Sequence, residues 1–318
     1  MATGSTPLQS FLGGIGLALP VHTLLMLNGS VFGIAGFLHR AVKGGMEDAA
    51  SVLGLLLGGI VVGAIEGPGP QMSEASSSTM IASGVLVGLG TKLSNGCTSG
   101  HMICGLSRLS PRSIVATATF FITGVLTTHV LHSSRLIAAG PADYTLGDHG
   151  TTFMIGSSVS MLSALVVQYL LSPPDSVDMP KIYDETYSHR RIVTSFLTAV
   201  SFSLALRLSN LTSPQRVLSF LILPFNSSFD PSLAFLAVGA LPLASALYRK
   251  WGRGLCPKTS AKVDWRLVTG AAVFGVGWGM EGICPGPGLV NFGRALATSS
   301  NIQPLAIWLV SVLVGGLL

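Results

Sequence analysis

Long apolar runs separated by short polar segments dominate this chain. The chain contains nine long runs and four shorter ones. The long runs are residues 11–27, 49–65, 79–93, 114–131, 153–171, 192–208, 233–247, 267–280 and 302–318, and the short runs are 31–38, 96–106, 214–223 and 284–296. A membrane-spanning helix needs about 20 mostly apolar residues, with a range of about 17–25. The pattern therefore predicts an all-α integral membrane protein with about nine transmembrane helices and four short re-entrant helices.

The composition agrees with a membrane protein and excludes a soluble domain. The chain is 49% hydrophobic and only 10% charged, whereas soluble domains contain about 25% charged residues. Its net charge of +5 does not indicate a nucleic-acid partner, because basic residues in membrane proteins mark cytoplasmic loops. The N-terminus has no basic stretch ahead of the first run, so we expect no cleaved signal peptide.

The chain contains two related halves. The order long, short, long, long, short, long occurs twice, and the run 153–171 links the two copies. Superposing Cys97 on Cys284 gives an offset of 284 − 97 = 187 residues, and the same offset places Gly88 on Gly275 and Gly90 on Gly277. We therefore expect a first membrane repeat with its linking helix in residues 1–172, a polar linker in 173–191, and a second membrane repeat in 192–318.

The distribution of basic residues predicts how the chain is oriented. If each short helix returns to its own side, four of the 18 lysines and arginines fall on one face and 18 − 4 = 14 on the other. The positive-inside rule places the richer face in the cytoplasm. The N-terminus is then outside, the C-terminus is cytoplasmic, and the plasma membrane is the expected location. The two repeats enter from opposite sides, and inverted repeats with broken helices are a common transporter plan.

Two cysteine-bearing segments, Gly96–Gly100 and Cys284–Gly288, interrupt the apolar runs at equivalent positions. Non-helical backbone at membrane depth survives only inside protein or beside a polar cavity. A helix that begins after such a break presents N–H groups and a positive dipole to an anion, and a thiol is a soft, weak donor. We therefore predict a small sulfur-containing anion as substrate, bound by Cys97 and Cys284, with close backbone approach at Gly96, Gly100, Gly286 and Gly288.

Three further residues beside the first break are candidates. Lys92 ends its apolar run, so it is either a functional charge or a side chain that extends to the membrane surface. His101 is expected to form hydrogen bonds at the pore, and Cys104 lies near the path. Together with Cys97 they do not meet the spacing rules for zinc. We expect no metal, no cofactor and no catalytic residue, and Cys256 has an ordinary loop setting.

The segments GLGTKLSNGCTSGHMICGLSRLSPRS and FGVGWGMEGICPGPGL resemble the YeeE/YedE family of sulfur-transport membrane proteins. In many bacteria the two halves are separate proteins, and this chain resembles their fusion. The resemblance implies thiosulfate uptake through an hourglass-shaped protein without large domain motion, with Cys97 and Cys284 as relay thiols. Some members have another cysteine near the first short helix, whereas residues 27–37 here have none, so sulfite or sulfide remains an alternative substrate.

Two other functions are compatible with these motifs. A membrane sulfurtransferase would hold a persulfide on Cys97, although the sequence offers no base beside the thiol other than His101. A structural subunit with inert thiols would leave the duplicated breaks unexplained. We therefore predict a transporter rather than an enzyme. Its expected partners are thiosulfate or a related sulfur anion, membrane lipid, and a cytoplasmic sulfur-accepting protein.

Overall fold

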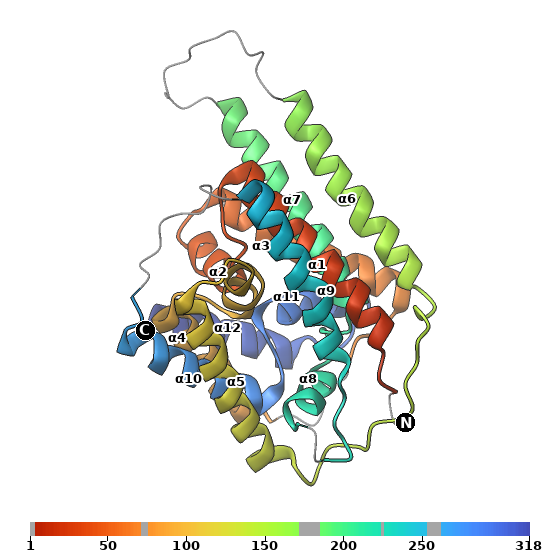
Figure 1. Ribbon diagram of the computed structural model, residues 1–318, viewed down its shortest axis with the longest axis vertical. Coiled ribbons are helices and arrows are strands. Elements are labelled where there is room, and N and C mark those ends of the chain that lie inside the picture. The colour runs from red at the N-terminus through yellow and green to blue at the C-terminus, as the bar shows by residue number, and fades with distance from the viewer. Residues whose placement is uncertain (1–3, 71–75, 172–184, 224–225, 253–261) are drawn as a thin grey trace.

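The chain folds into an all-helical bundle (Figure 1). The computed structural model describes residues 4–70, 76–171, 185–223, 226–252 and 262–318, and these contain no β-strand. Cys256 and most of the predicted linker 173–191 lie outside the described residues. The all-α fold predicted from the apolar runs is confirmed.

Each predicted run corresponds to a helix, in the predicted order. The first half contains α1 (Pro7–Asn28), α2 (Ile34–Val42), α3 (Met46–Glu66), α4 (Ser77–Ser94), the π-helix η1 (Ser99–Leu106) and α5 (Pro111–His132), and α6 (Gly150–Leu170) follows. The second half contains α7 (Glu185–Leu208), α8 (Pro214–Leu221), α9 (Ser232–Leu247) extended by the π-turn η2 (Tyr248–Gly252), α10 (Trp265–Glu281), α11 (Pro285–Ala297) and α12 (Gln303–Leu317). Helix α7 begins inside the predicted linker. Its first turns are polar, so the apolar pattern did not include them.

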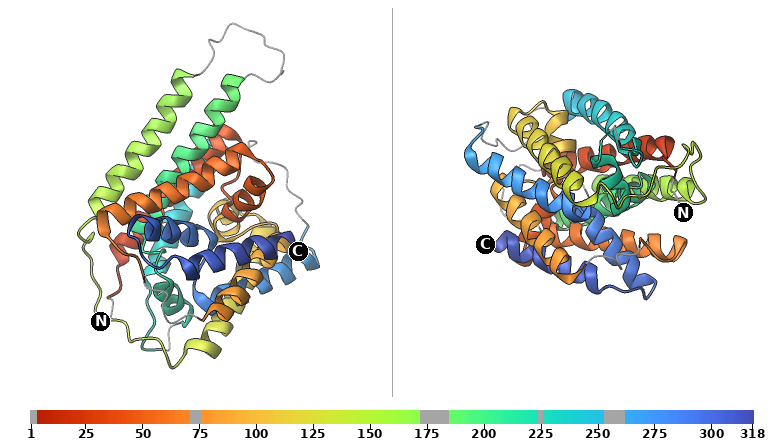
Figure 2. Two further views of the ribbon diagram at one scale, coloured as in Figure 1. Left: turned by 180° about the vertical axis from the view of Figure 1, so that it is seen from behind. Right: turned by 90° about the horizontal axis from the view of Figure 1, so that it is seen from below.

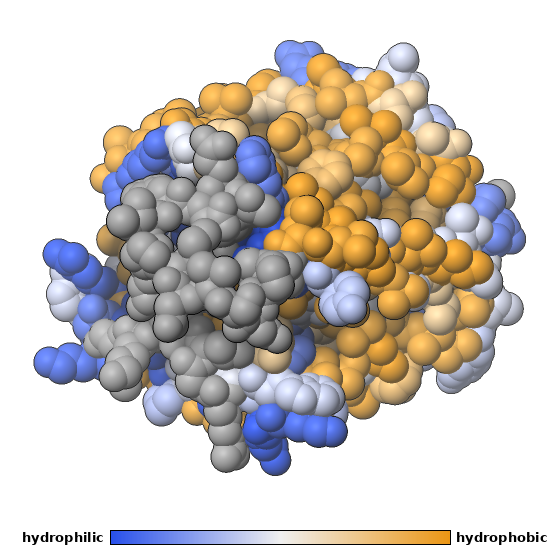
Figure 3. Space-filling view, turned by 90° about the horizontal axis from the view of Figure 1, so that it is seen from above, coloured by the Kyte–Doolittle hydropathy of each residue, from blue (hydrophilic) through white to orange (hydrophobic). Residues whose placement is uncertain are grey.

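Seven helical stretches of the described chain are long and apolar enough to cross a membrane. Of the other long helices, α12 is a shorter apolar helix, and α4 packs against both α10 and α12. On α6, Ile155, Val159, Leu162 and Val166 are exposed at a spacing of three and four residues, which places them on one face. Figure 3 shows a broad hydrophobic area on one side of the molecule. This is a multi-pass membrane protein with a lipid-facing surface.

Equivalent helices of the two halves run antiparallel where they touch. A Cβ added at Gly90 of α4 would meet Gly270 and Phe274 of α10, while one added at Gly277 of α10 would meet Ser83 and Val87 of α4. The two contacts are related by the repeat. Adding the offset of 187 to the α4 residues Ser83 and Val87 gives the α10 residues Gly270 and Phe274, since 83 + 187 = 270 and 87 + 187 = 274. Antiparallel contact between equivalent helices is the geometry of an inverted repeat.

Other pairs of packed helices are related by the same repeat. Helix α3 packs on α7 and α1 on α9, while α4 packs on α12 and α10 on α5. The short helices follow this arrangement, with η1 against α5 and α11 against α12. Seen from behind, α11 also lies against α3 (Figure 2). The two halves are therefore interleaved, and their short helices meet in the interior.

Candidate functional site

Both helix breaks are built on the same backbone turn. Helix α4 ends at Asn95 with φ 55°, and α10 ends at Gly282 with φ 67°. These are equivalent positions, since 95 + 187 = 282, and Asn and Gly are the residues that tolerate this left-handed conformation best. Each turn is followed after two residues by a cysteine at the start of a short helix, namely Cys97 before η1 and Cys284 before α11.

The two cysteines meet at a small central cavity of about 70 Å³. At least one residue of each short helix lines it, together with residues of the surrounding long helices. The lining residues are Ile34, Cys97, Thr98, Ser99, Met102, Ile103, Phe121, Phe202, Leu206, Leu211, Phe220, Leu233, Leu236, Trp278, Cys284, Pro285, Gly286 and Pro287. Cys97 is 2% exposed and Cys284 is 5% exposed. The structure therefore places both cysteines at the same cavity.

Hydroxyl groups connect the two thiols to the backbone around them. Thr98 Oγ1 donates to Cys284 Sγ over 3.6 Å, which joins the first half of the chain to the second. Ser99 Oγ lies 3.3 Å from Cys97 Sγ and accepts a hydrogen bond from the backbone N–H of Ile34 at 3.4 Å. The sequence motif contains both hydroxyl residues, but their partners are distant in sequence, so sequence reasoning did not find these contacts.

The start of α11 offers fewer donors than a typical helix end. Pro285 and Pro287 have no backbone N–H, and the N–H of Gly288 donates to Cys284 O at 2.9 Å. Gly286 is therefore the one residue of the first three in α11 with an N–H to present. The anion site predicted at this helix end has a single backbone donor, and other groups must supply the rest.

A much larger chamber, about 990 Å³ in volume, lies on the other side of the first break. Gly96, Gly100 and His101 line this chamber, whereas Cys97, Thr98 and Ser99 line the central cavity. One turn of backbone thus separates the two spaces. The beginning of α2 contributes in the same way, since Ile34 lines the cavity and its neighbours Gly33 and Ala35 line the chamber.

The chamber is positively charged. Its charged lining residues are Arg40, Lys43, Glu47, Asp48, Lys92, Arg108 and Arg112, which gives five basic groups against two acidic ones. Both acidic groups are paired with arginines, Asp48 with Arg40 at 2.7 Å and Glu47 with Arg191 at 2.5 Å. A concave surface of one sign raises the local concentration of the opposite ion. The chamber is therefore an environment that attracts anions.

Lys92 and His101 have structural partners at the chamber wall. Lys92 Nζ donates to the carbonyl of Leu317 at 3.0 Å, at the C-terminal end of α12. The carbonyl of Ser94 can only accept, so His101 Nε2 donates to it at 3.3 Å and Nδ1 accepts from Ser113 Oγ at 3.2 Å. Both ring nitrogens of His101 are occupied in this way. The base that a persulfide mechanism on Cys97 would require is therefore already engaged.

Two predicted site residues line neither the central cavity nor the chamber. Cys104 is also buried, but its Sγ lies 3.9 Å from the carbonyl oxygen of Phe32, and it lines a separate, smaller pocket. A Cβ at Gly288 would lie 2.8 Å from the ring of Trp308, so this glycine provides room for helix packing. Among the described residues, no group of three or more His, Cys, Asp or Glu side chains is arranged to hold a metal ion.

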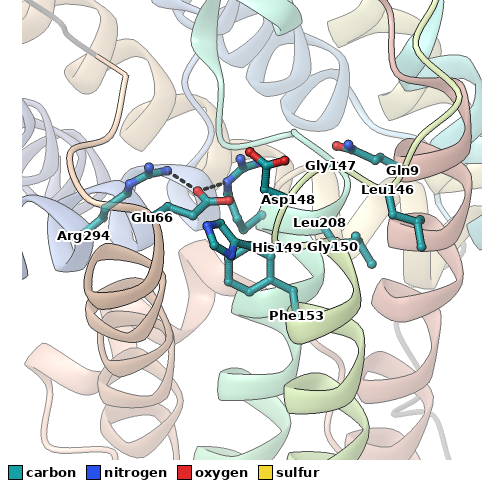
Figure 4. Close-up of a pocket in the computed structure, with 11 residues that line it drawn as sticks. Gln9, Glu66, Leu146, Gly147, Asp148, His149, Gly150, Phe153, Leu208 and Arg294 are labelled. Carbon is teal, nitrogen blue, oxygen red and sulfur yellow. Dashed lines mark hydrogen bonds and ion pairs between the residues drawn. The ribbon is translucent and has the colours of Figure 1, made fainter.

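A polar pocket of about 390 Å³ lies at the other end of α3 from the chamber (Figure 4). Glu66 accepts from Arg207 at 2.5 Å and from Arg294 at 3.0 Å. Arg294 also donates to the carbonyls of Gly67 and Pro68 at 2.8 and 2.9 Å. Because Arg294 belongs to α11, this cluster fixes the far end of the helix that begins at Cys284. Sequence reasoning missed it, since Glu66 and Arg294 are 228 residues apart.

Replacing Glu66 with glutamine should destabilise the protein. The side chains of Glu66 and Arg294 are 10% and 9% exposed, and a hydrogen bond to a charged group contributes about 1.5–3 kcal/mol. We expect a loss of about that size, measured as a lower melting temperature of the purified protein in detergent. Asp48→Asn is the control, because its partner Arg40 is 56% exposed and such pairs contribute about 0–1 kcal/mol. Equal shifts in both variants would contradict a structural role for the cluster.

The interleaved helices and the thiol-lined cavity belong to a multi-pass membrane transporter of sulfur compounds. Residues 3–127 match the family described as "Sulphur transport", and residues 190–318 match a family of unknown function, DUF6691. A "Probable transporter" of Xylella fastidiosa strain 9a5c is 50% identical over 119 residues, which cover 36% of this chain and 88% of the relative. This chain belongs to the sulphur transport family, which confirms the resemblance to YeeE/YedE proteins.

Further relatives agree with this assignment. A "Probable transporter" of Xylella fastidiosa strain Temecula1 is 47% identical over 119 residues, covering 36% of this chain and 88% of the relative. A second one from that strain is 37% identical over 120 residues, covering 35% and 80%. No solved structure matches the chain. The two family matches fall on separate ranges, as expected for a fusion of two half-length units.

Proposed function

We propose that this protein imports thiosulfate across the plasma membrane and that the substrate passes between the thiols of Cys97 and Cys284. One observation supports this most directly: equivalent cysteines of two inverted halves line a single small cavity where all four short helices meet. A structural role alone does not explain why both halves place a thiol at the same turn.

The chemistry of a thiol suits the terminal sulfur of thiosulfate. An S–H group is a weak donor and its sulfur a weak, polarisable acceptor, so it holds a soft sulfur atom without binding it tightly. The substrate moves by exchanging S–H contacts between Cys97 and Cys284. No covalent bond forms or breaks, and no oxidant or reductant is needed. Gly286, which lies against Ile34, lets the backbone approach the anion closely.

The size of the cavity fits a small anion. Its volume is about 70 Å³, and one ordered water needs about 10–15 Å³ of such space. The cavity therefore has room for a few heavy atoms, which is the size of a thiosulfate ion. Larger organic sulfur compounds would require the surrounding helices to separate.

The charged chamber indicates the direction of transport. We assign the chamber to the cytoplasmic side, with the N-terminus outside and the C-terminus inside, because the basic residues of the chain concentrate at this end. An anion that leaves the cavity enters a positively lined space that retains it. A cytoplasmic sulfur-accepting protein would collect it at the mouth of this chamber.

Growth and uptake measurements test the substrate. Bacterial cells that lack their own thiosulfate importers should grow on thiosulfate as sole sulfur source when they express this chain, and should fail with an empty vector. Uptake of radiolabelled thiosulfate should be blocked by excess unlabelled thiosulfate. If excess sulfite or sulfide competes equally well, the protein is not selective for thiosulfate. If the chain gives no growth although it reaches the membrane, thiosulfate is not the substrate.

A further inference from the structure

Trp278 has a buried donor group with no partner. The side chain lies on α10, is 4% exposed, and lines the central cavity together with Cys97 and Cys284. Its Nε1 forms no hydrogen bond within the described part of the chain. The indole N–H can only donate, and a buried tryptophan normally finds a partner for it. Such an unpaired buried donor requires an acceptor that the described residues do not supply, and a ligand in the adjacent cavity is a group that can supply it.

Packing holds the indole ring in place. Its centroid lies 6.0 Å from that of Phe120, 6.5 Å from that of Phe121 and 6.3 Å from that of Phe274. A Cβ at Gly124 would be 3.2 Å from the ring, so the neighbouring helix α5 also approaches closely. The donor is therefore fixed before any substrate arrives, as a group that selects a ligand should be.

The other buried tryptophan provides a direct comparison. Trp308 is 0% exposed, and its Nε1 donates to Ser83 Oγ at 3.1 Å. The protein thus satisfies one buried indole through a nearby serine but leaves the one at the thiol cavity unsatisfied. The cavity also has few other free donors, since Thr98 donates to Cys284 and the first turn of α11 contains two prolines.

We propose that the Trp278 Nε1–H group donates a hydrogen bond to an oxygen of the transported anion and so determines its specificity. Thiosulfate has two different ends. Its sulfonate oxygens accept from the indole N–H, while its terminal sulfur lies against the thiols. Hydrosulfide has no oxygen and gains nothing from Trp278. This inference rests on the proposed transport of thiosulfate and adds the group that distinguishes an oxyanion from sulfide.

Binding measurements on Trp278→Phe test this role, because phenylalanine keeps an aromatic ring and removes the donor. Wild type, W278F and W308F are purified in detergent and titrated with thiosulfate and with hydrosulfide. We expect W278F to bind thiosulfate about tenfold or more weakly than wild type, because the variant lacks a hydrogen bond to a charged ligand. Hydrosulfide binding should not change in W278F. Both affinities should stay within about twofold of wild type in W308F, whose indole has another partner.

Three outcomes would overturn the inference. W278F could bind thiosulfate as tightly as wild type, W308F could weaken binding as much, or W278F could weaken hydrosulfide binding equally. If wild type binds no thiosulfate, the proposed function fails as well, so the two failures are distinguishable.

If W278F does not fold, the four indole N–H signals of ¹⁵N-tryptophan-labelled wild type are assigned with W251F, W265F and W308F. Addition of thiosulfate should then shift the Trp278 signal downfield, and an unmoved signal overturns the inference.

Discussion

Alanine in place of either Cys97 or Cys284 should reduce thiosulfate uptake by about tenfold or more. Each substitution removes one of the two thiols that line the central cavity. A hydrogen bond to a charged group contributes about 1.5–3 kcal/mol, and a weak thiol donor belongs at the lower end of that range. Because the substrate must exchange contacts between the two thiols, loss of one leaves no second position to receive it. The measurement is the initial rate of radiolabelled thiosulfate uptake, normalised to the amount of protein in the membrane.

Cys104→Ala is the matched control for these variants. Cys104 is a third buried cysteine and belongs to η1, but it is not among the residues that line the central cavity. We expect its uptake rate to stay within about threefold of wild type, since it does not line the central cavity. Uptake that falls as far in C104A as in C97A would show that the relay is not confined to the central cavity. Normal uptake in both C97A and C284A would refute the relay.

Valine in place of Gly90 or Gly277 should prevent stable folding. A Cβ at Gly90 would lie 2.4 Å from Phe274 N and 2.7 Å from Gly270 O, and one at Gly277 would lie 2.8 Å from Ser83 O. These neighbours are backbone atoms, which cannot move aside without displacing a helix. Overpacking typically costs about 1–3 kcal/mol and occasionally more, and we expect at least the upper value. The readout is the melting temperature and the yield of folded protein in detergent.

Gly100→Ala tests whether this effect comes from helix crossing. A Cβ at Gly100 would meet no atom within 4 Å, and a helical glycine destabilises by about 0.5–1 kcal/mol relative to alanine. The melting temperature of G100A should therefore equal that of wild type or exceed it slightly. If G90V and G277V were as stable as G100A, the close antiparallel crossing of α4 and α10 would be wrong.

The sequence predicted the helices and the breaks because these depend on local chemistry. Apolar runs determine which segments can be buried in lipid, so every run corresponds to a helix in the predicted order. The offset between Cys97 and Cys284 predicted that the two breaks are equivalent, and the matching left-handed residues Asn95 and Gly282 show the same relation in the backbone. The joint lining of one cavity by both thiols follows from the inverted arrangement.

The contacts that complete the site could not be predicted, because they depend on which helices cross. Nothing near Thr98 in the sequence indicates that it donates to Cys284, and the pairing of Glu66 with Arg294 depends on α11 lying along α3. Nothing in the sequence around Trp278 indicates whether its indole N–H has a partner, whereas the structure shows an unpaired donor in a residue that lines the cavity. Such features require the relative positions of whole helices, which local patterns do not contain.

The barrier between the cavity and the chamber has a consequence for kinetics. It consists of one turn, Gly96–His101, together with the start of α2, and the hydrogen bond from Ile34 to Ser99 joins the two parts. Loop motions take about nanoseconds to microseconds, whereas hinge motions of domains take about microseconds to milliseconds. Because Gly96 and Cys97 lie outside the helices on either side, we expect this thin barrier to open on the faster scale. The turnover rate would then depend on how quickly the anion is captured and released, and cells could adjust flux through the supply of acceptor in the cytoplasm.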